Sequence, residues 1–205
     1  MIQAIVLAAG RSQRMGYPKP LVRIGCATFL EHVLGQIRAT EIKQPLVVLG
    51  HRAGEIEQQS GTGVRGAGSR GEGLRFVINS EYDKGQFSSL QCGIRNLESA
   101  CEAVVVCLVD QPQIRDAWIN RLLAGFRKSG APIVRPRYRG RGGHPVLYAR
   151  SLFEEILDME ATLSARDLLG RHREEVEEIE IDDEAILFNA NRPEDLKRLM
   201  AYIDL

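Results

Sequence analysis

The sequence predicts an α/β fold in which helices flank both faces of a doubly wound, mostly parallel sheet. Apolar runs typical of strands alternate with amphipathic stretches typical of helices, and the runs are apolar throughout, as in strands buried on both faces. The first run feeds a glycine turn, which is how such a strand often opens onto a ligand. With 205 residues and no internal repeat, residues 1–205 are predicted to form a single domain.

Each element follows from a local pattern. Strands are predicted at 2–8, 45–50, 74–79 and 102–110, and helices at 28–39, 87–100 and 116–127. The acidic run 173–184 alternates apolar and charged positions, which predicts a solvated edge strand. Pro193 is expected at the first position of a C-terminal helix, with acidic residues in its first turn.

Two segments interrupt this alternation. Residues 60–73 are rich in glycine and predict a surface loop, because regular structure there is costly in backbone entropy. Residues 135–145 carry arginines at alternate positions, from 135 to 141, and are expected to form a basic loop that either is solvated or faces a substrate.

The composition disfavours proteins that bind nucleic acid or membranes through their overall charge, and it disfavours membrane-spanning and secreted proteins. The formal net charge is +0, so no overall charge favours nucleic acid or a membrane surface, and any attraction to an anionic ligand must be local. No apolar run reaches about 18 residues, and the N-terminal residues do not resemble a signal peptide. We therefore expect a cytoplasmic protein. The four cysteines contain no CxxC pair and are expected to be buried, reduced thiols.

The segment "LAAGRSQRMGYPKPL", residues 7–21, concentrates positive charge at the end of the first strand. Gly10 lets backbone amides approach a phosphate, and Arg11, Arg14 and Lys19 can neutralise phosphate charge. The spacing fits neither GxGxxG nor the P-loop pattern. From spacing alone, a phosphate-binding loop and a solvated turn remain equal alternatives.

Three further positions stand at strand or turn ends. Asp110 ends the most hydrophobic strand, where it can hold a ligand or cap a helix, and the following Gln-Pro favours an extended loop over a cap. Ser88 and Ser89 can cap the helix that follows Gly85 or can border a ligand. His144 lies in a glycine-rich turn and is either a satisfied loop histidine or a substrate contact.

Five motifs in order resemble the molybdenum cofactor nucleotidyltransferases, on the cytidylyltransferase side. "LAAGRSQRMGYPK" is similar to the family's nucleotide-binding signature. The other matching segments are "NSEYDKGQFSSLQCGI" (79–94), "LVDQPQI" (108–114), "RGGHPVLY" (141–148) and "SARDLL" (164–169). The resemblance covers most of the chain and implies a Rossmann-like sheet of the nucleotide-diphospho-sugar transferase type.

The resemblance also implies residue roles. Nucleotide binding is assigned to the first loop and to the second motif: Leu7, Ala8, Ala9, Gly10, Ser12, Arg14, Lys19, Asn79, Ser88 and Ser89. Asp110 is implied to bind Mg²⁺, with Asn191 as a further ligand, and Arg14, Lys19 and Asp110 are implied to be catalytic. Arg141, Gly143 and His144 fall on the pterin side of the cleft, and Arg137 and Arg139 are further candidates for its phosphate. Gly93 is expected to serve close packing of its helix.

The implied reaction is transfer of CMP from CTP to the terminal phosphate of molybdopterin, with release of pyrophosphate. One departure concerns the base, because Asn189 and Asn191 replace acids of the cytidylyltransferase branch and resemble the guanylyltransferase branch. "LAAG" at 7–10 instead resembles the cytidylyltransferase branch, and because this loop lies on the base side the resemblance implies CTP over GTP. The alternatives are GTP-dependent transfer, transfer to another phosphorylated acceptor such as a sugar or polyol phosphate, and a non-catalytic carrier that hands the pterin to a molybdoenzyme. A hydride-transfer enzyme is disfavoured, since no GxGxxG follows the first strand.

Overall fold

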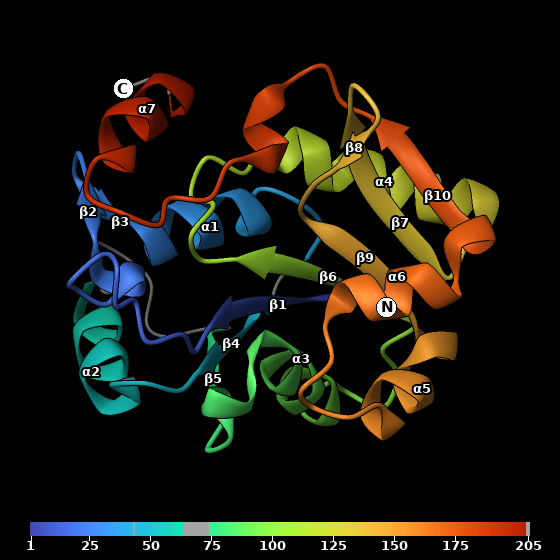
Figure 1. Cartoon of the computed structure of the whole chain (residues 1–205), viewed down its shortest axis with the longest axis horizontal. Helices are drawn as coiled ribbons and strands as arrows, with labels where there is room; N and C mark the ends of the chain where they lie inside the picture. The colour runs from blue at the N-terminus through green and yellow to red at the C-terminus, as the bar shows by residue number, and fades with distance from the viewer. Residues whose placement is uncertain (43, 64–73, 204–205) are drawn as a thin grey trace.

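A twisted sheet with helices on both faces organises the chain (Figure 1). The computed structural model describes residues 1–42, 44–63 and 74–203. The strand order is β10-β7-β9-β6-β1-β4-β5, and β8 pairs with β7. These strands are β1 (Ile2–Ala8), β4 (Leu46–Leu49), β5 (Arg75–Ile78), β6 (Ala103–Leu108), β7 (Ile133–Tyr138), β8 (Arg141–Gly142), β9 (Val146–Ala149) and β10 (Val176–Glu180).

Strand direction and order place the ligand edge. The pairs β1–β4, β1–β6, β4–β5 and β7–β10 are parallel, whereas β9 runs antiparallel to both β6 and β7. The chain moves outward from β1 through β4 to β5 and then returns to place β6 on the other side of β1. The order therefore reverses between β1 and β6, and ligands bind at such a switch point, outside the carboxyl ends of the strands.

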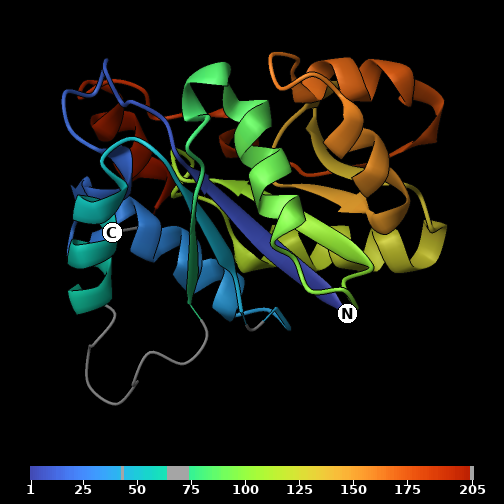
Figure 2. The same ribbon diagram turned by 90° about the horizontal axis from the view of Figure 1, so that it is seen from below.

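Two hydrophobic layers cover the sheet (Figure 2). Helices α1 (Phe29–Arg38), α2 (Ala53–Gly63) and α4 (Asp116–Ser129) pack on one face. Helices α3 (Gln86–Arg95), α5 (Phe153–Asp158) and α6 (Ala165–Arg171) pack on the other. The hairpin β2 (Arg23–Ile24) and β3 (Ala27–Thr28), and α7 (Asp195–Tyr202) near the C-terminus, complete the described strands and α-helices, which short 3-10 turns connect. The predicted doubly wound, mostly parallel fold is confirmed.

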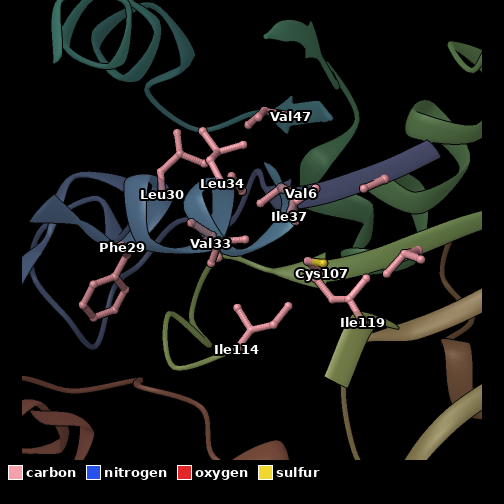
Figure 3. Packing of buried hydrophobic residues seen from close by; sticks show 14 of the residues in the cluster. Val6, Phe29, Leu30, Val33, Leu34, Ile37, Val47, Cys107, Ile114 and Ile119 are labelled. Carbon is pink, nitrogen blue, oxygen red and sulfur yellow. The ribbon is translucent and has the colours of Figure 1, made fainter. Parts of the chain in front are cut away.

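Helix α1 shows why these segments fold as they do. The Thr28 hydroxyl accepts a hydrogen bond from the Glu31 amide at 3.2 Å, and the Glu31 carboxylate accepts one from the Thr28 amide at 2.7 Å. This capping box fixes the start of the helix. Its Val33 and Ile37 then pack in one hydrophobic cluster with Val6 of β1 and Cys107 of β6 (Figure 3).

Several predicted boundaries were wrong. Residues 60–63 end helix α2 instead of beginning a loop, and 64–73 lie outside the described residues. Residues 135–138 are not part of a loop, because they belong to strand β7. Helix α7 begins at Asp195, so Pro193 lies in the turn before it. The edge strand expected within 173–184 is confirmed as β10.

The thiols and the helix lengths complete the description. Cys101 and Cys107 are buried as expected, but Cys92 is only half-buried and Cys26 is exposed. All four are free thiols. Within the described ranges, no helix is both long and apolar enough to cross a membrane.

Candidate active site

A cavity of about 480 Å³ opens where β1 and β6 end. Its walls come from the loop after β1, the turn after β6, the segment before and at the start of α3, and the chain before α7. The lining residues are Leu7, Ala8, Ala9, Gly10, Arg11, Ser12, Gln13, Arg14, Lys19, Pro20, Tyr82, Gly85, Gln86, Ser89, Val109, Asp110 and Asn191. The topology thus gathers most of the residues expected to bind a nucleotide into one cavity.

The loop after β1 is shaped by Ser12. This residue has a φ of 54°, a left-handed conformation that side-chain-bearing residues rarely adopt, and its carbonyl accepts hydrogen bonds from the amides of Met15 and Gly16. The Ser12 hydroxyl accepts a hydrogen bond from the Lys19 amide at 3.0 Å. Ser12 therefore anchors the backbone from which the Lys19 side chain enters the cavity.

Lys19 links two parts of the chain that lie far apart in sequence. Its ammonium donates to Asp110 Oδ2 at 2.8 Å and to Asn191 Oδ1 at 2.9 Å. Arg14 Nη2 donates to the same Asn191 oxygen at 2.9 Å. The side chains of Lys19 and Asp110 are 14% and 20% exposed, so this ion pair is sheltered from solvent on most sides. The three residues expected to be catalytic, Arg14, Lys19 and Asp110, meet here.

Asp110 is held by a second contact and does not cap a helix. Its Oδ1 accepts a hydrogen bond from Asn189 Nδ2 at 3.0 Å, and Gln111 donates to Asn189 at 3.1 Å. Helix α4 begins only at Asp116, without a side-chain cap. The capping alternative for Asp110 is therefore wrong, and the preference for an extended loop after it is confirmed.

Asn191 is positioned by the start of α7. Its amide and that of Arg192 donate to the Asp195 carboxylate at 2.7 and 2.8 Å, and these bonds lower the pKa of Asp195. Asn191 Nδ2 donates to the Asn189 carbonyl at 3.2 Å, which leaves Asn191 Oδ1 directed at Lys19 and Arg14. Asn189 and Asn191 thus act at the charged end of the cavity.

An ion pair holds Arg11, one of the residues that line the cavity. Arg11 Nε and Nη2 donate to the two Asp83 oxygens at 2.8 and 2.7 Å, which lowers the pKa of Asp83 and raises that of Arg11. The Arg11 guanidinium also lies 5.9 Å from the centre of the Tyr82 ring. Tyr82 lines the cavity and was not predicted to do so, although it and Asp83 lie within the motif at 79–94. Gln13 and Gln86 were not predicted either, because no pattern distinguishes them.

The second motif contributes one wall residue and its support. Ser89 lines the cavity, whereas Asn79 and Ser88 lie buried behind it. Asn79 Nδ2 donates to the hydroxyls of Ser88 at 2.9 Å and Ser89 at 3.0 Å, and the Ser88 hydroxyl donates to the Gly85 carbonyl at 2.8 Å. The expectation that these serines cap α3 is wrong, because neither hydroxyl accepts a helix amide.

His144 belongs to a smaller, neighbouring cavity of about 100 Å³. Leu7 and Gln86 line both cavities, so the two adjoin. Burial lowers the pKa of His144 to about 4, against the opposing effect of the Asp110 charge, and the imidazole is therefore neutral near pH 7. Its Nδ1 has no partner among the described residues. Gly143 supports this turn, since a Cβ there would come within 2.4 Å of the Ile186 carbonyl oxygen.

The arginines of 135–141 separate into different roles. Arg135 Nε donates to Glu178 of β10 at 3.0 Å, and Arg137 Nη1 lies 2.8 Å from the same carboxylate. These two arginines therefore join β7 to β10, which disfavours Arg137 as a phosphate ligand. Arg139 lies over the Tyr138 ring. Arg141 is exposed and makes no ion pair with any residue that the structure describes.

Comparison with known proteins places this chain in a family. The MobA-like NTP transferase domain matches residues 4–176. Bifunctional protein GlmU of Synechococcus sp. (strain RCC307) is 29% identical over 175 residues, 84% of this chain and 36% of its own length. The bifunctional IPC transferase and DIPP synthase of Rubrobacter xylanophilus is 31% identical over 188 residues, 84% of this chain and 41% of its own length. The chain thus spans about two fifths of these curated relatives.

Solved structures share the fold over nearly the whole chain. An Rv0371c homologue from Mycobacterium sp. strain JC1 aligns with a TM-score of 0.80 at 27% identity, covering 99% of this chain and 96% of the other. Rv0371c of Mycobacterium tuberculosis in complex with manganese aligns at 0.75 with 26% identity and 98% coverage of both chains. Molybdopterin-guanine dinucleotide biosynthesis protein A of Archaeoglobus fulgidus also shares the fold. It aligns with a TM-score of 0.72 at 19% identity, covering 100% of this chain and 99% of the other.

The family match covers most of the sheet and all but the last lining residue of the cavity. The chain therefore belongs to the MobA-like NTP transferase family, and residues 4–176 carry its nucleotidyltransferase domain.

Proposed function

We propose that residues 1–205 act as one domain that transfers CMP from CTP to the terminal phosphate of molybdopterin and releases pyrophosphate. The contact of Lys19 with Asp110 and Asn191, with Arg14 beside it, carries this proposal. Two cations, one carboxylate and one amide oxygen converge at the topological switch point of the sheet, inside a cavity large enough for a nucleotide.

The reaction needs positioning and charge stabilisation more than a base. A phosphate monoester is largely ionised near pH 7, so its oxygen can attack the α-phosphorus in line without proton removal. Arg14 and Lys19 would hold the triphosphate and stabilise the negative charge that builds on the leaving pyrophosphate. The backbone amides at Gly10 would bind phosphate oxygens at the end of β1.

The donor set fits Mg²⁺ in the company of a triphosphate. Asp110 and Asn191 offer the oxygen ligands that Mg²⁺ prefers, and Mg²⁺ is usually held by one or two carboxylates plus substrate phosphates. No group of three or more His, Cys, Asp or Glu side chains that could hold a metal occurs among the residues the structure describes, so the protein alone offers a sparse site. When bound, Mg²⁺ would offset charge on the triphosphate.

The neighbouring cavity, of about 100 Å³, is too small for a whole ligand, but its uncharged walls support an acceptor that places part of an uncharged ring there. His144 is neutral there, and the other walls are mostly apolar, with Phe87, Leu90 and Tyr148 among them. This cavity adjoins the nucleotide cavity through Leu7 and Gln86. Arg139 and Arg141 are exposed near the turn and make no ion pair with a described residue, so these two arginines are left to meet the acceptor's phosphate.

Asn189 and Asn191 contact the charged residues of the site, so their identity does not decide which nucleobase binds. Asn189 contacts Asp110, and Asn191 contacts Lys19 and Arg14, so both act at the phosphate end. The nucleobase must then be read elsewhere in the cavity, and the "LAAG" segment supports CTP over GTP.

The test is pyrophosphate release with Mg²⁺, molybdopterin and CTP, GTP or ATP in turn. Release with CTP supports the proposal, and release with GTP alone would assign the guanylyl reaction. Replacing molybdopterin by a sugar or polyol phosphate separates the other acceptor class. Binding of nucleotide and pterin without any pyrophosphate would instead favour a carrier. Asp110→Ala should lower turnover by roughly 10²-fold or more, since it removes a charged contact to the reacting groups.

A further inference from the structure

Lys19 occupies the place where a divalent cation would bind. Its ammonium lies 2.8 Å from Asp110 Oδ2 and 2.9 Å from Asn191 Oδ1, the two oxygens proposed as metal ligands. The other Asp110 oxygen is held by the Asn189 amide at 3.0 Å. An incoming cation and the lysine therefore compete for the same carboxylate oxygen.

We propose that Lys19 acts as a resident counter-charge for Asp110, so that metal and nucleoside triphosphate bind as one unit and the nucleotide-free protein holds metal weakly. This inference rests on the proposed function of the cavity. It gives Lys19 a positioning role in the free protein besides its contact with phosphate.

The charge balance of the cavity favours this coupling. Among its lining residues, Asp110 is the one acid, against Arg11, Arg14 and Lys19. Arg11 is already paired with Asp83, whereas Arg14 and Lys19 converge on Asn191. A bare divalent cation at Asp110 would meet the positive charges of Arg14 and Lys19 at close range, and the nearby Asp195 carboxylate is already held by the amides of Asn191 and Arg192. A triphosphate supplies negative charge that stabilises both the metal as it binds and Lys19 once it has left Asp110.

The geometry allows Lys19 to move without disturbing the loop. Its backbone amide is fixed by the Ser12 hydroxyl at 3.0 Å, while its four-carbon side chain can turn from Asp110 toward a phosphate. Asn189 keeps Asp110 oriented when the lysine leaves. Binding would therefore exchange one partner of Asp110 for another with little change in the surrounding structure.

The experiment measures Mn²⁺ binding by water-proton relaxation enhancement, which separates protein-bound Mn²⁺ from Mn²⁺ held by free CTP. Wild type, Lys19→Met and the charge-preserving Lys19→Arg are titrated with and without CTP. We expect Lys19→Met to bind Mn²⁺ alone about 10-fold or more tightly than wild type, with a smaller gain on adding CTP. Lys19→Arg should bind Mn²⁺ alone as weakly as wild type.

Controls separate the possible failures. Lys84→Met removes an exposed lysine that pairs with Glu81, and it should leave the Mn²⁺ affinity unchanged. Equal Mn²⁺ affinity of folded wild type and Lys19→Met, or equal wild-type affinity with and without CTP while CTP binding is shown by dialysis, would overturn this inference alone. Absence of CTP binding by wild type would overturn the proposed function and this inference together.

Discussion

Gly10 lines the cavity at a position where neither the packing nor the backbone conformation requires a glycine. A Cβ built there meets no described atom within 4 Å, and its φ lies outside the left-handed range. A ligand that approaches the backbone closely remains as the reason for a glycine. Gly10→Ala should therefore weaken CTP binding while changing the free energy of unfolding by less than about 1 kcal/mol.

Calorimetric titration with CTP and thermal unfolding of the same protein check this prediction. An alanine variant with wild-type affinity for CTP would show that no ligand approaches the backbone at Gly10.

At the scale of elements, Gly93 sets how closely α3 approaches β1. A Cβ at Gly93 would lie 2.7 Å from Ile5 Cδ1, and Ile5 is completely buried. This confirms the packing role expected for Gly93. Gly93→Ala should destabilise the protein by about 1–3 kcal/mol through overpacking. Adding Ile5→Val, which removes Cδ1, should recover part of that loss in chemical denaturation.

Gly35 of α1 is the matched control for that substitution. A Cβ there has no described neighbour within 4 Å, so Gly35→Ala should stabilise the protein by up to about 1 kcal/mol through helix propensity. Equal effects of the two alanines would contradict the packing argument.

His172 follows the last residue of helix α6, and both of its ring nitrogens are hydrogen-bonded. Glu155 lies 2.6 Å from Nε2 and Glu175 lies 2.8 Å from Nδ1, and these bonds raise the pKa of His172. A raised folded pKa contributes stability that is fully present below the unfolded value of about 6.5 and is lost as pH rises through the folded value.

The measurement compares the free energy of unfolding of wild type and His172→Gln. The difference between them should be largest at about pH 5.5, below the unfolded pKa of about 6.5, and should shrink as the pH rises through the raised pKa of the folded state. His172 lowers the pKa of Glu155, so the contribution of Glu155 to stability is lost only at a lower pH than this range. A difference independent of pH would show that the charge of His172 does not matter.

The elements also show which patterns a sequence can reveal. Strands β1, β4 and β6 are buried on both faces, so their continuous apolar runs allowed them to be predicted from the sequence. Strand β7 contains Pro136 between two arginines and looked like a loop. It is a strand because its backbone pairs with β10 on one side and with β9 on the other. Both arginines also contact Glu178 of β10, which lies 43 residues away from Arg135. A local pattern does not show a partner at that distance.

At the scale of the whole molecule, the cavity joins both ends of the chain. Arg14 and Asn191 are hydrogen-bonded across 177 positions, so the charged end of the site forms only when the whole sheet is assembled. The motifs identified Arg14, Lys19 and Asp110. The contact of Asn189 with Asp110 depends on the path of the chain before α7, so the sequence indicated the asparagines without showing what they bond.

Nucleotide binding should therefore stabilise both ends together. CTP with Mg²⁺ at 100 times its dissociation constant should raise the free energy of unfolding by about 2.7 kcal/mol. Hydrogen exchange should show protection at Ser12–Lys19 and at Asn189–Asn191 in the same complex. Asn191→Ala should reduce both effects, and protection confined to the N-terminal loop would contradict this view of the site.

The reversed direction of β9 has a consequence for how such a protein can diversify. Since β9 runs against β6 and β7, the hairpin between β7 and β9 returns to the edge where β6 ends. That hairpin carries Arg141 and His144, and both its ends are fixed in the sheet. Grafting a different hairpin between Tyr138 and Val146 would leave the exits of β1 and β6 intact. Natural variation or a designer can therefore exchange the hairpin that we propose to meet the acceptor and keep the ends of β1 and β6, which line the larger cavity.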